Sequence, residues 1–244
     1  MLVATFVLLG LAFGSFGNVL ILRLPRRRSI AGRSACPRCR ALLRWYELIP
    51  VVSFLFLRGR CGHCGAAISW QYPVVEAGSA LLFLAALFHE RGGVLTALPL
   101  ACALWLLFLI AVTDARTRLI PDALSLPFLL VSVLYAVAAD AFSWWGPLLA
   151  GGFFALQWVM SRGRWIGSGD ILLGLGIGAL LSAWQSVYLF LTLSYVTGAL
   201  YACALLLLRR RTSKDMLPFG PFLALGAMLT VFFGDWMLWW MGMM

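Results

Sequence analysis

The sequence predicts an all-α membrane protein: a bundle of about eight spanning helices with a small zinc-binding domain between the first and second spans. Of its 244 residues, 63% are hydrophobic and only 11% are charged. The mean hydropathy is +0.95, so the chain cannot hide its apolar surface in a water-soluble globule. Its apolar runs are long and continuous, which favours spanning helices. Four cysteines gather in the only sizeable polar stretch, which predicts the inserted domain.

Hydropathy gives the positions of the expected spans, since roughly 17 to 25 residues cross a bilayer as a helix. The second, fifth and sixth segments are short, so those helices are expected to be tilted, joined or broken. The first segment has no basic start and no small-x-small cleavage site, so we interpret it as a retained span and not as a signal peptide. The expected segments are 2–22, 73–88, 94–113, 122–139, 147–160, 170–182, 185–208 and 218–240. The expected domains are a first transmembrane helix (1–24), a cytoplasmic zinc-binding domain (25–72) and a second transmembrane domain (73–244), which carries Asp114 and Asp170.

The net charge of +10 is explained by topology. Of the 19 Lys and Arg residues, all but Arg91 fall in alternate loops between the expected spans. This positive-inside pattern places both chain ends outside and the loops that follow odd-numbered spans in the cytoplasm. We therefore expect contact with membrane lipid and no nucleic-acid partner. The basic residues between the seventh and eighth spans are Arg209, Arg210, Arg211 and Lys214.

The polar stretch carries two C-x2-C pairs, Cys36 with Cys39 and Cys61 with Cys64, separated by 21 residues. This spacing is typical of zinc ribbons, in which four thiolates complete a tetrahedral shell. A cytoplasmic segment is kept reduced, so metal is favoured over two disulfides. His63 is an alternative ligand for one position. With four protein ligands the site has no open position and is expected to be structural.

Two aspartates stand at the ends of apolar runs, Asp114 in "TDARTRLIPD" and Asp170 in "GSGD". The topology places both at the cytoplasmic ends of their spans. A carboxylate in a membrane helix is a functional candidate by default. Two adjacent carboxyl groups can share one proton and activate a water molecule, as in aspartic peptidases. Gly167 and Gly169 would let the backbone approach a partner closely.

A simpler interpretation stays open for the same aspartates. Asp170 would be a cap at the start of its helix, and Asp114 would pair with Arg116 or Arg118. The first span holds a second open question at "GSFGN". Its small residues fit close helix packing, whereas Asn18 could also face a polar cavity.

Six motifs in order resemble the type IV prepilin peptidase family, bifunctional leader peptidases and N-methyltransferases of bacterial pilus and type II secretion systems. The motifs are "GSFGNVLILRLP" (14–25), the two cysteine pairs around "ELIPVVSFLFLRGR" (47–60), "ISWQYPVVE" (68–76), "TDARTRLIPD" (113–122), "GSGD" (167–170) and "LPFGPFLALG" (217–226).

The resemblance implies catalytic roles for Asp114 and Asp170 and zinc on the four cysteines. It implies a prepilin or pseudopilin substrate, cut at the cytoplasmic face of the bacterial inner membrane, and S-adenosylmethionine as methyl donor. No motif identifies the residues that bind this donor. Many members carry lysine two residues after the second aspartate, where this chain has Leu172. The sequence gives neither the oligomeric state nor the particular pilin.

Two other functions compete with this one. A presenilin-like intramembrane protease shares the G-x-G-D motif, but the cysteine pairs and "PFGP" (218–221) favour the prepilin branch. A transporter or membrane scaffold would use the aspartates as a proton or ion relay. Such a relay needs carboxylates on both sides of the membrane, and the outer halves of the spans offer few.

Overall fold

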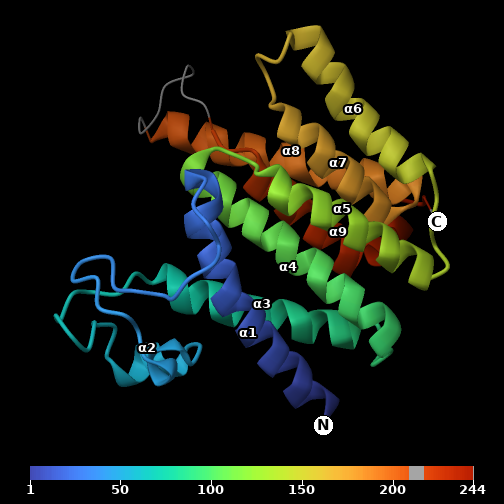
Figure 1. Cartoon of the computed structure of the whole chain (residues 1–244). Helices are drawn as coiled ribbons and strands as arrows, with labels where there is room; N and C mark the ends of the chain where they lie inside the picture. Colours follow the sequence, from blue (N-terminus) through green and yellow to red (C-terminus); the bar gives the residue numbers. More distant parts are fainter. Residues whose placement is uncertain (209–216, 244) are drawn as a thin grey trace. The chain divides into compact units, whose positions relative to one another are not determined.

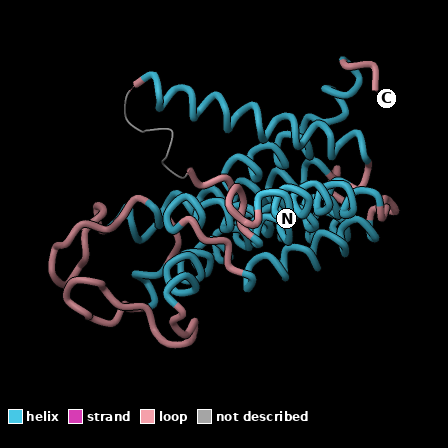
Figure 2. The backbone as a smooth tube through the Cα atoms, turned by 90° about the horizontal axis from the view of Figure 1, so that it is seen from above, coloured by secondary structure: helices cyan, strands magenta, loops and turns pink. Residues whose placement is uncertain are grey.

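The chain is built of helices and loops in the computed structural model, which describes residues 1–208 and 217–243. Within these ranges there is no β-strand, only two isolated bridges, Ala35 with Leu42 and Arg60 with Ala67 (Figures 1 and 2). The all-α class is therefore confirmed for the described residues. Arg209, Arg210, Arg211 and Lys214, which the topology argument uses, lie outside them.

Eight helices coincide with the eight expected apolar segments, with ends shifted by a few residues. A short helix, α2 (Val52–Phe56), and two 3₁₀ turns, η1 (Leu24–Arg26) and η2 (Trp45–Leu48), lie in the polar stretch. The eight are α1 (Leu2–Arg23), α3 (Gln71–His89), α4 (Val94–Thr117), α5 (Asp122–Ala138), α6 (Trp145–Ser161), α7 (Ser168–Leu181), α8 (Trp184–Leu207) and α9 (Gly220–Trp240).

Only five of the described helices are long and apolar enough to cross a membrane: α1, α3, α4, α8 and α9. Two others, α5 and α7, are apolar but shorter. The chain is a multi-pass membrane protein, whereas eight crossings stay a prediction. The shortness of α7, 14 residues, gives a rise of about 21 Å at 1.5 Å per residue, less than a typical hydrocarbon core.

The described structure divides into two compact units, Met1–Ala101 and Cys102–Met244, and the division falls within α4. In the first unit α1 packs against α3. A Cβ at Gly14 would lie 2.6 Å from the Cα of Glu76, so only glycine allows this approach. The Asn18 amide donates to the carbonyl of Tyr72 (3.2 Å) and accepts from Gln71 (3.2 Å). Asn18 therefore joins two helices, which supports packing as the role of this segment.

Residues between α1 and α3 are mostly loop, and the predicted domain limits at 24 and 72 stay predictions. Few side chains are buried here: Cys36, Phe54 and Cys61. Phe54 of α2 packs its ring against Trp70 with the centroids 4.9 Å apart. So small a core cannot order almost fifty residues alone, which is the usual reason for a structural metal.

In the second unit α7 packs against its neighbours α5, α6, α8 and α9. Glycines make this possible, as expected from their frequency in the sequence. The backbones of Gly146 in α6 and Gly178 in α7 touch, and a Cβ at Gly174 would lie 2.5 Å from the ring of Phe154. Phe154 is fully buried. Close helix packing therefore fixes α7, the helix that carries Asp170.

Candidate active site

Asp114 lies in the last turn of α4, which ends at Thr117 because Arg118 turns the chain with a φ of +56°. Its side chain is buried, with 5% of the residue exposed. Oδ2 accepts a 2.8 Å hydrogen bond from the backbone N–H of Gly220, the first residue of α9. N–H groups in the first turn of a helix have no partner within the helix, and the helix dipole favours an anion there. The start of α9 therefore holds the carboxylate of Asp114.

Asp170 is the third residue of α7 and is also buried, with 8% exposed. Its Oδ2 accepts a 2.9 Å hydrogen bond from the backbone N–H of Gly167, the residue before the helix. This is half of a capping box, so the capping role considered from the sequence is present. Capping leaves the other carboxylate oxygen, Oδ1, for further interactions.

The two carboxyl groups lie close enough to interact electrostatically. The backbone explains how α4 and α7 bring them together. The loop after α4 passes the start of α7, where a Cβ at Gly169 would lie 3.0 Å from the Cβ of Ile120. This is tighter than side chains normally pack, so Gly169 allows the approach. In the described part of the chain Asp114 forms no ion pair with Arg116 or Arg118.

The two glycines of "GSGD" differ in what the structure asks of them. Gly167 has an extended backbone with φ −80° and ψ 158°, which any residue adopts, and a Cβ there would make ordinary contact with Asp170 at 3.6 Å. Its N–H group, which every residue but proline has, is the part in use. Gly169 is the position at which the absence of a side chain matters.

Gly220 is a site residue that the sequence did not identify. A Cβ at this position would lie 2.8 Å from Oδ2 of Asp114. The motif "PFGP" could have indicated this residue, because its glycine lies between phenylalanine and proline at the start of a helix, α9. Nothing in one sequence shows that the N–H of this glycine meets a carboxylate 106 positions earlier.

Tyr195 of α8 is a second residue that sequence reasoning missed. It interacts electrostatically with Asp170. Its hydroxyl accepts from Nε2 of Gln157 (2.8 Å) and donates to Oε1 of the same amide (3.0 Å). The ring packs edge-on against Phe219, 5.1 Å between centroids, and Phe219 precedes the glycine that holds Asp114. The sequence did offer one signal for this residue, because Gln157 and Tyr195 are polar side chains in two otherwise apolar helices.

The four cysteines meet, as their spacing predicts. Their sulfur atoms all lie within 4.8 Å of one another, and Sγ of Cys36 is 3.9 Å from Sγ of Cys64. Tetrahedral zinc with Zn–S bonds of about 2.3 Å needs sulfurs about 3.8 Å apart. The residues therefore fit a structural zinc ion.

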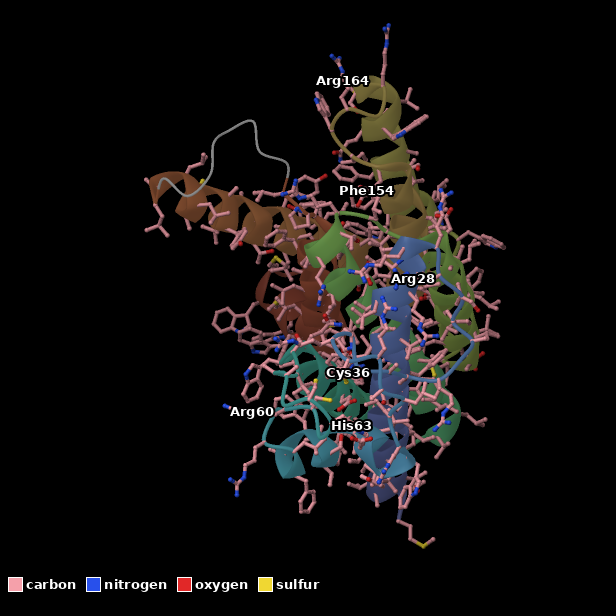
Figure 3. All side chains as sticks on the ribbon, turned by 60° about the vertical axis from the view of Figure 1, so that its left-hand side comes forward. Arg28, Cys36, Arg60, His63, Phe154 and Arg164 are labelled. Carbon is pink, nitrogen blue, oxygen red and sulfur yellow. The ribbon has the colours of Figure 1, made fainter. Side chains whose placement is uncertain are left out.

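His63 has another neighbour. Its Nε2 lies 3.6 Å from Oε2 of Glu47, and the four-sulfur group is complete without it. Figure 3 shows Cys36 and His63 close together, with Arg60 directed away from them. The four-thiolate set is therefore the better description of this candidate metal site.

Comparison with known proteins gives two family matches. Residues 8–90 match the family described as Bacterial Peptidase A24 N-terminal domain. Residues 101–203 match the Type IV leader peptidase family. The first match contains the cysteine pairs, and the second contains both aspartates and Tyr195. No solved structure matches the chain.

Similar proteins carry the name Prepilin leader peptidase/N-methyltransferase. One from Bacillus subtilis (strain 168) is 38% identical over 93% of this chain and 92% of its own. One from Burkholderia pseudomallei is 34% identical over 93% of this chain and 84% of its own. One from Pseudomonas aeruginosa is 33% identical over 94% of this chain and 89% of its own. These similarities extend over nearly the whole chain, so they cover the cysteine pairs and the aspartates together.

Proposed function

Because the chain belongs to the type IV leader peptidase family, we propose that it cuts the basic leader from type IV prepilins or pseudopilins with Asp114 and Asp170. We further propose that it methylates the new N-terminal amine with S-adenosylmethionine. The observation that supports the cleavage most strongly is the pair of buried carboxyl groups, each held by one backbone N–H and interacting with the other.

The cleavage chemistry follows from the pairing. Two adjacent carboxyl groups resist joint ionisation and hold one proton between them. The ionised carboxylate takes a proton from water while the water oxygen attacks the scissile carbonyl carbon, and the protonated carboxyl group gives its proton to the carbonyl oxygen. Collapse of the tetrahedral intermediate breaks the C–N bond, and the leaving amine takes up a proton. The N–H groups of Gly220 and Gly167 keep both carboxyl groups oriented.

The location of the aspartates fits this substrate class. Both stand at helix ends, Asp114 in the last turn of α4 and Asp170 in the first turn of α7. The distribution of arginines supports a position of these ends on the cytoplasmic side of the membrane, which we take to be the bacterial inner membrane. A prepilin would present its hydrophobic helix within the bilayer and its scissile bond at the cytoplasmic interface. Leu172 on α7 stands where many members of the family carry lysine.

Zinc, held by Cys36, Cys39, Cys61 and Cys64, would order the segment between α1 and α3. Four protein ligands leave no position for a substrate, so its contribution is structural. S-adenosylmethionine, when bound, would supply the methyl group that the new N-terminal amine of the pilin receives.

The test of this function is a cleavage and methylation assay in lipid nanodiscs, with the product read by mass spectrometry. Asp114→Asn and Asp170→Asn are each expected to lower cleavage by about 10²- to 10⁴-fold, the usual contribution of an acid–base group. The matched control is Asp122→Asn, because Asp122 is an exposed carboxylate in the first turn of α5. This variant should cut the prepilin at the normal rate.

A second control separates this family from general intramembrane proteolysis. A membrane helix without a basic leader should remain uncut by the unsubstituted protein. Full cleavage by either aspartate variant would exclude the two-carboxyl mechanism. Cleavage of the leaderless helix would favour the presenilin-like alternative.

A further inference from the structure

The segment between α1 and α3 exposes large apolar side chains, although its longest helix, α2, has only five residues and crosses no membrane. Phe56 is 84% exposed, Trp45 78% and Leu55 66%. One exposed apolar side chain is common, whereas a group of them marks a surface that meets lipid or another protein. We call this group the apolar surface; it comprises Trp45, Tyr46, Leu48, Ile49, Val52, Leu55 and Phe56, from η2 to α2.

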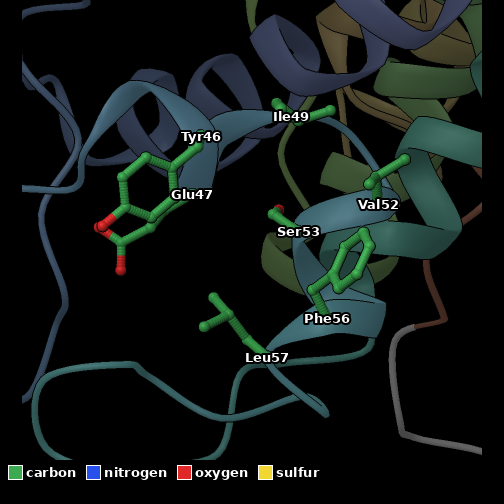
Figure 4. A pocket seen from close by; sticks show the side chains of 7 residues that line it. All are labelled: Tyr46, Glu47, Ile49, Val52, Ser53, Phe56 and Leu57. Atoms are coloured by element: carbon green, nitrogen blue, oxygen red, sulfur yellow. The ribbon is translucent and has the colours of Figure 1, made fainter.

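The apolar surface is hollowed. An open hollow of about 320 Å³ lies between η2 and α2. Figure 4 shows its opposite walls, with Tyr46 and Glu47 on one side and Val52 and Phe56 on the other. Sites for soluble ligands enclose most of the ligand and hold several polar groups that orient it. An open hollow with mostly apolar walls fits the apolar parts of lipid molecules better.

Two contacts hold the apolar surface beside the start of α3. Val51, between η2 and α2, has a φ of +62°, which is rare for a β-branched residue and costs free energy. Its N–H donates a 2.7 Å hydrogen bond to Oε2 of Glu76, a buried carboxylate in the second turn of α3. Phe54 of α2 packs its ring against Trp70, the residue before α3. The first two turns of α3 therefore fix the position of η2 and α2.

The start of α3 gives the level of the bilayer surface. This helix has 19 residues, which rise about 28 Å at 1.5 Å per residue, close to the thickness of about 30 Å of a hydrocarbon core. Its first residue, Gln71, therefore lies near one edge of the core. Trp70 is 71% exposed at the level where tryptophan concentrates in membrane proteins. The apolar surface, held beside these residues, lies at the level of the lipid headgroups.

The charge of the segment favours lipid over the substrate as the partner of this surface. Residues 25–72 contain nine arginines, all exposed, and a single acidic residue, Glu47. The Glu47 side chain is only 5% exposed, and Oε2 accepts the N–H of Arg44 (2.8 Å) and lies 3.6 Å from Nε2 of His63. The segment therefore presents positive charge, which attracts anionic phospholipid and repels the basic leader of a prepilin. The arginines are Arg26, Arg27, Arg28, Arg33, Arg38, Arg40, Arg44, Arg58 and Arg60.

We propose that the apolar surface inserts into the headgroup layer of the membrane and that the surrounding arginines bind anionic phospholipid there. Segments that lie in this layer bury Trp, Phe and Leu side chains by about 5–10 Å and direct basic side chains to the headgroups. The insertion attaches the segment to the membrane at a third place, besides α1 and α3. This inference uses the membrane character of the chain and does not depend on the proposed cleavage or methylation.

The test is photolabelling of the full chain in nanodiscs of equal parts phosphatidylcholine and phosphatidylglycerol. The probe is a phospholipid with a diazirine near its headgroup, and mass spectrometry of the peptides locates the label, which is expected within residues 45–57. In nanodiscs of phosphatidylcholine alone this label should fall at least about threefold, because the arginines lose their anionic partner. A probe with the diazirine at the end of its acyl chain should label α1 and α3 but not residues 45–57.

A double variant tests the apolar side chains. Leu55→Glu combined with Phe56→Glu places two charges in the expected lipid contact. Losing the burial of one large apolar side chain shifts an equilibrium by about tenfold, so label in residues 45–57 should fall at least about fivefold. The matched control is Leu42→Glu, because Leu42 is 52% exposed between the cysteine pairs and outside the apolar surface. It should be labelled normally, and unchanged zinc content in both variants would show that the segment keeps its fold.

Two results would overturn the insertion. One is equal label in the two lipid mixtures, which is measured on the unsubstituted protein and so decides the question even if the double variant fails to fold. The other is cross-linking of residues 45–57 to a diazirine in the hydrophobic helix of a prepilin, with no label from the headgroup probe, which would assign the surface to the substrate. Neither result bears on the aspartates, which lie outside this segment.

Discussion

The cysteine segment (residues 25–72) and the aspartate-bearing helices (α4, α7 and α9) are ordered in different ways. The cysteine segment buries only Cys36, Phe54 and Cys61, and its structure depends on loop hydrogen bonds and four converging sulfurs. The aspartate-bearing helices rely on packing so close that glycines are required at Gly169, Gly174, Gly178 and Gly220. One region is therefore sensitive to metal, and the other to the volume of single side chains.

Metal removal should produce the largest separation between the two regions. We expect chelation, or Cys36→Ser combined with Cys61→Ser, to disorder the cysteine segment, because loss of the metal releases the loop that carries Gly62 and His63 next to Glu47. Leader cleavage should persist within about threefold, since the packing of the helices does not use the metal. Metal analysis should find about one zinc per unsubstituted chain, as one four-thiolate site requires, and none in the double variant. Loss of leader cleavage in the metal-free protein would contradict this separation.

Gly220→Ala should have the next largest effect. This change should lower leader cleavage and leave the cysteine segment unaffected, the reverse of metal removal. The added Cβ would lie 2.8 Å from Oδ2 of Asp114, so the carboxylate must move from the N–H that holds it. Displacement of a catalytic group by about 1 Å costs up to about 100-fold in rate, and we expect cleavage to fall by about 10- to 100-fold with zinc content unchanged.

The matched control for this change is Gly152→Ala in α6, where a new Cβ meets nothing within 4 Å. It should cut the leader at the normal rate. Normal cleavage by Gly220→Ala would mean that Asp114 does not need its contact with the start of α9.

Tyr195→Phe should give the smallest effect. The change removes the hydroxyl that bonds to Gln157 but keeps the ring against Phe219. A neutral hydrogen bond contributes about 0.5 to 1.5 kcal/mol, so we expect the cleavage rate to fall by about two- to tenfold. If Tyr195 positions Asp170, the pH profile of cleavage should also shift, whereas a purely structural role would lower the rate equally at every pH.

The sequence predicted what depends on local pattern and on spacing. The apolar segments mark eight helices, and the C-x2-C pairs mark the four-sulfur cluster because each pair is a local turn. Asp114 and Asp170 could be singled out because carboxylates are costly in apolar helices.

Contacts between distant segments could not be predicted in the same way. No local pattern shows that the N–H of Gly220 meets Asp114, that Tyr195 approaches Asp170, or that Glu76 holds Val51 at a positive φ. Each of these joins residues from different helices or loops, and side-chain packing in three dimensions decides it. The number of membrane crossings could not be predicted from hydropathy alone either. A helix of 14 residues such as α7 is apolar but is too short to span a bilayer by itself.

The most direct test gives each variant two substrates, an intact prepilin and a pilin that has already been cut, and weighs the products by mass spectrometry. We expect Asp114→Asn and Asp170→Asn to leave the prepilin intact but to methylate the pre-cut pilin, and the cysteine double variant to cut the prepilin. Normal cleavage of the prepilin by either aspartate variant would contradict the claim that these two carboxyl groups perform the hydrolysis.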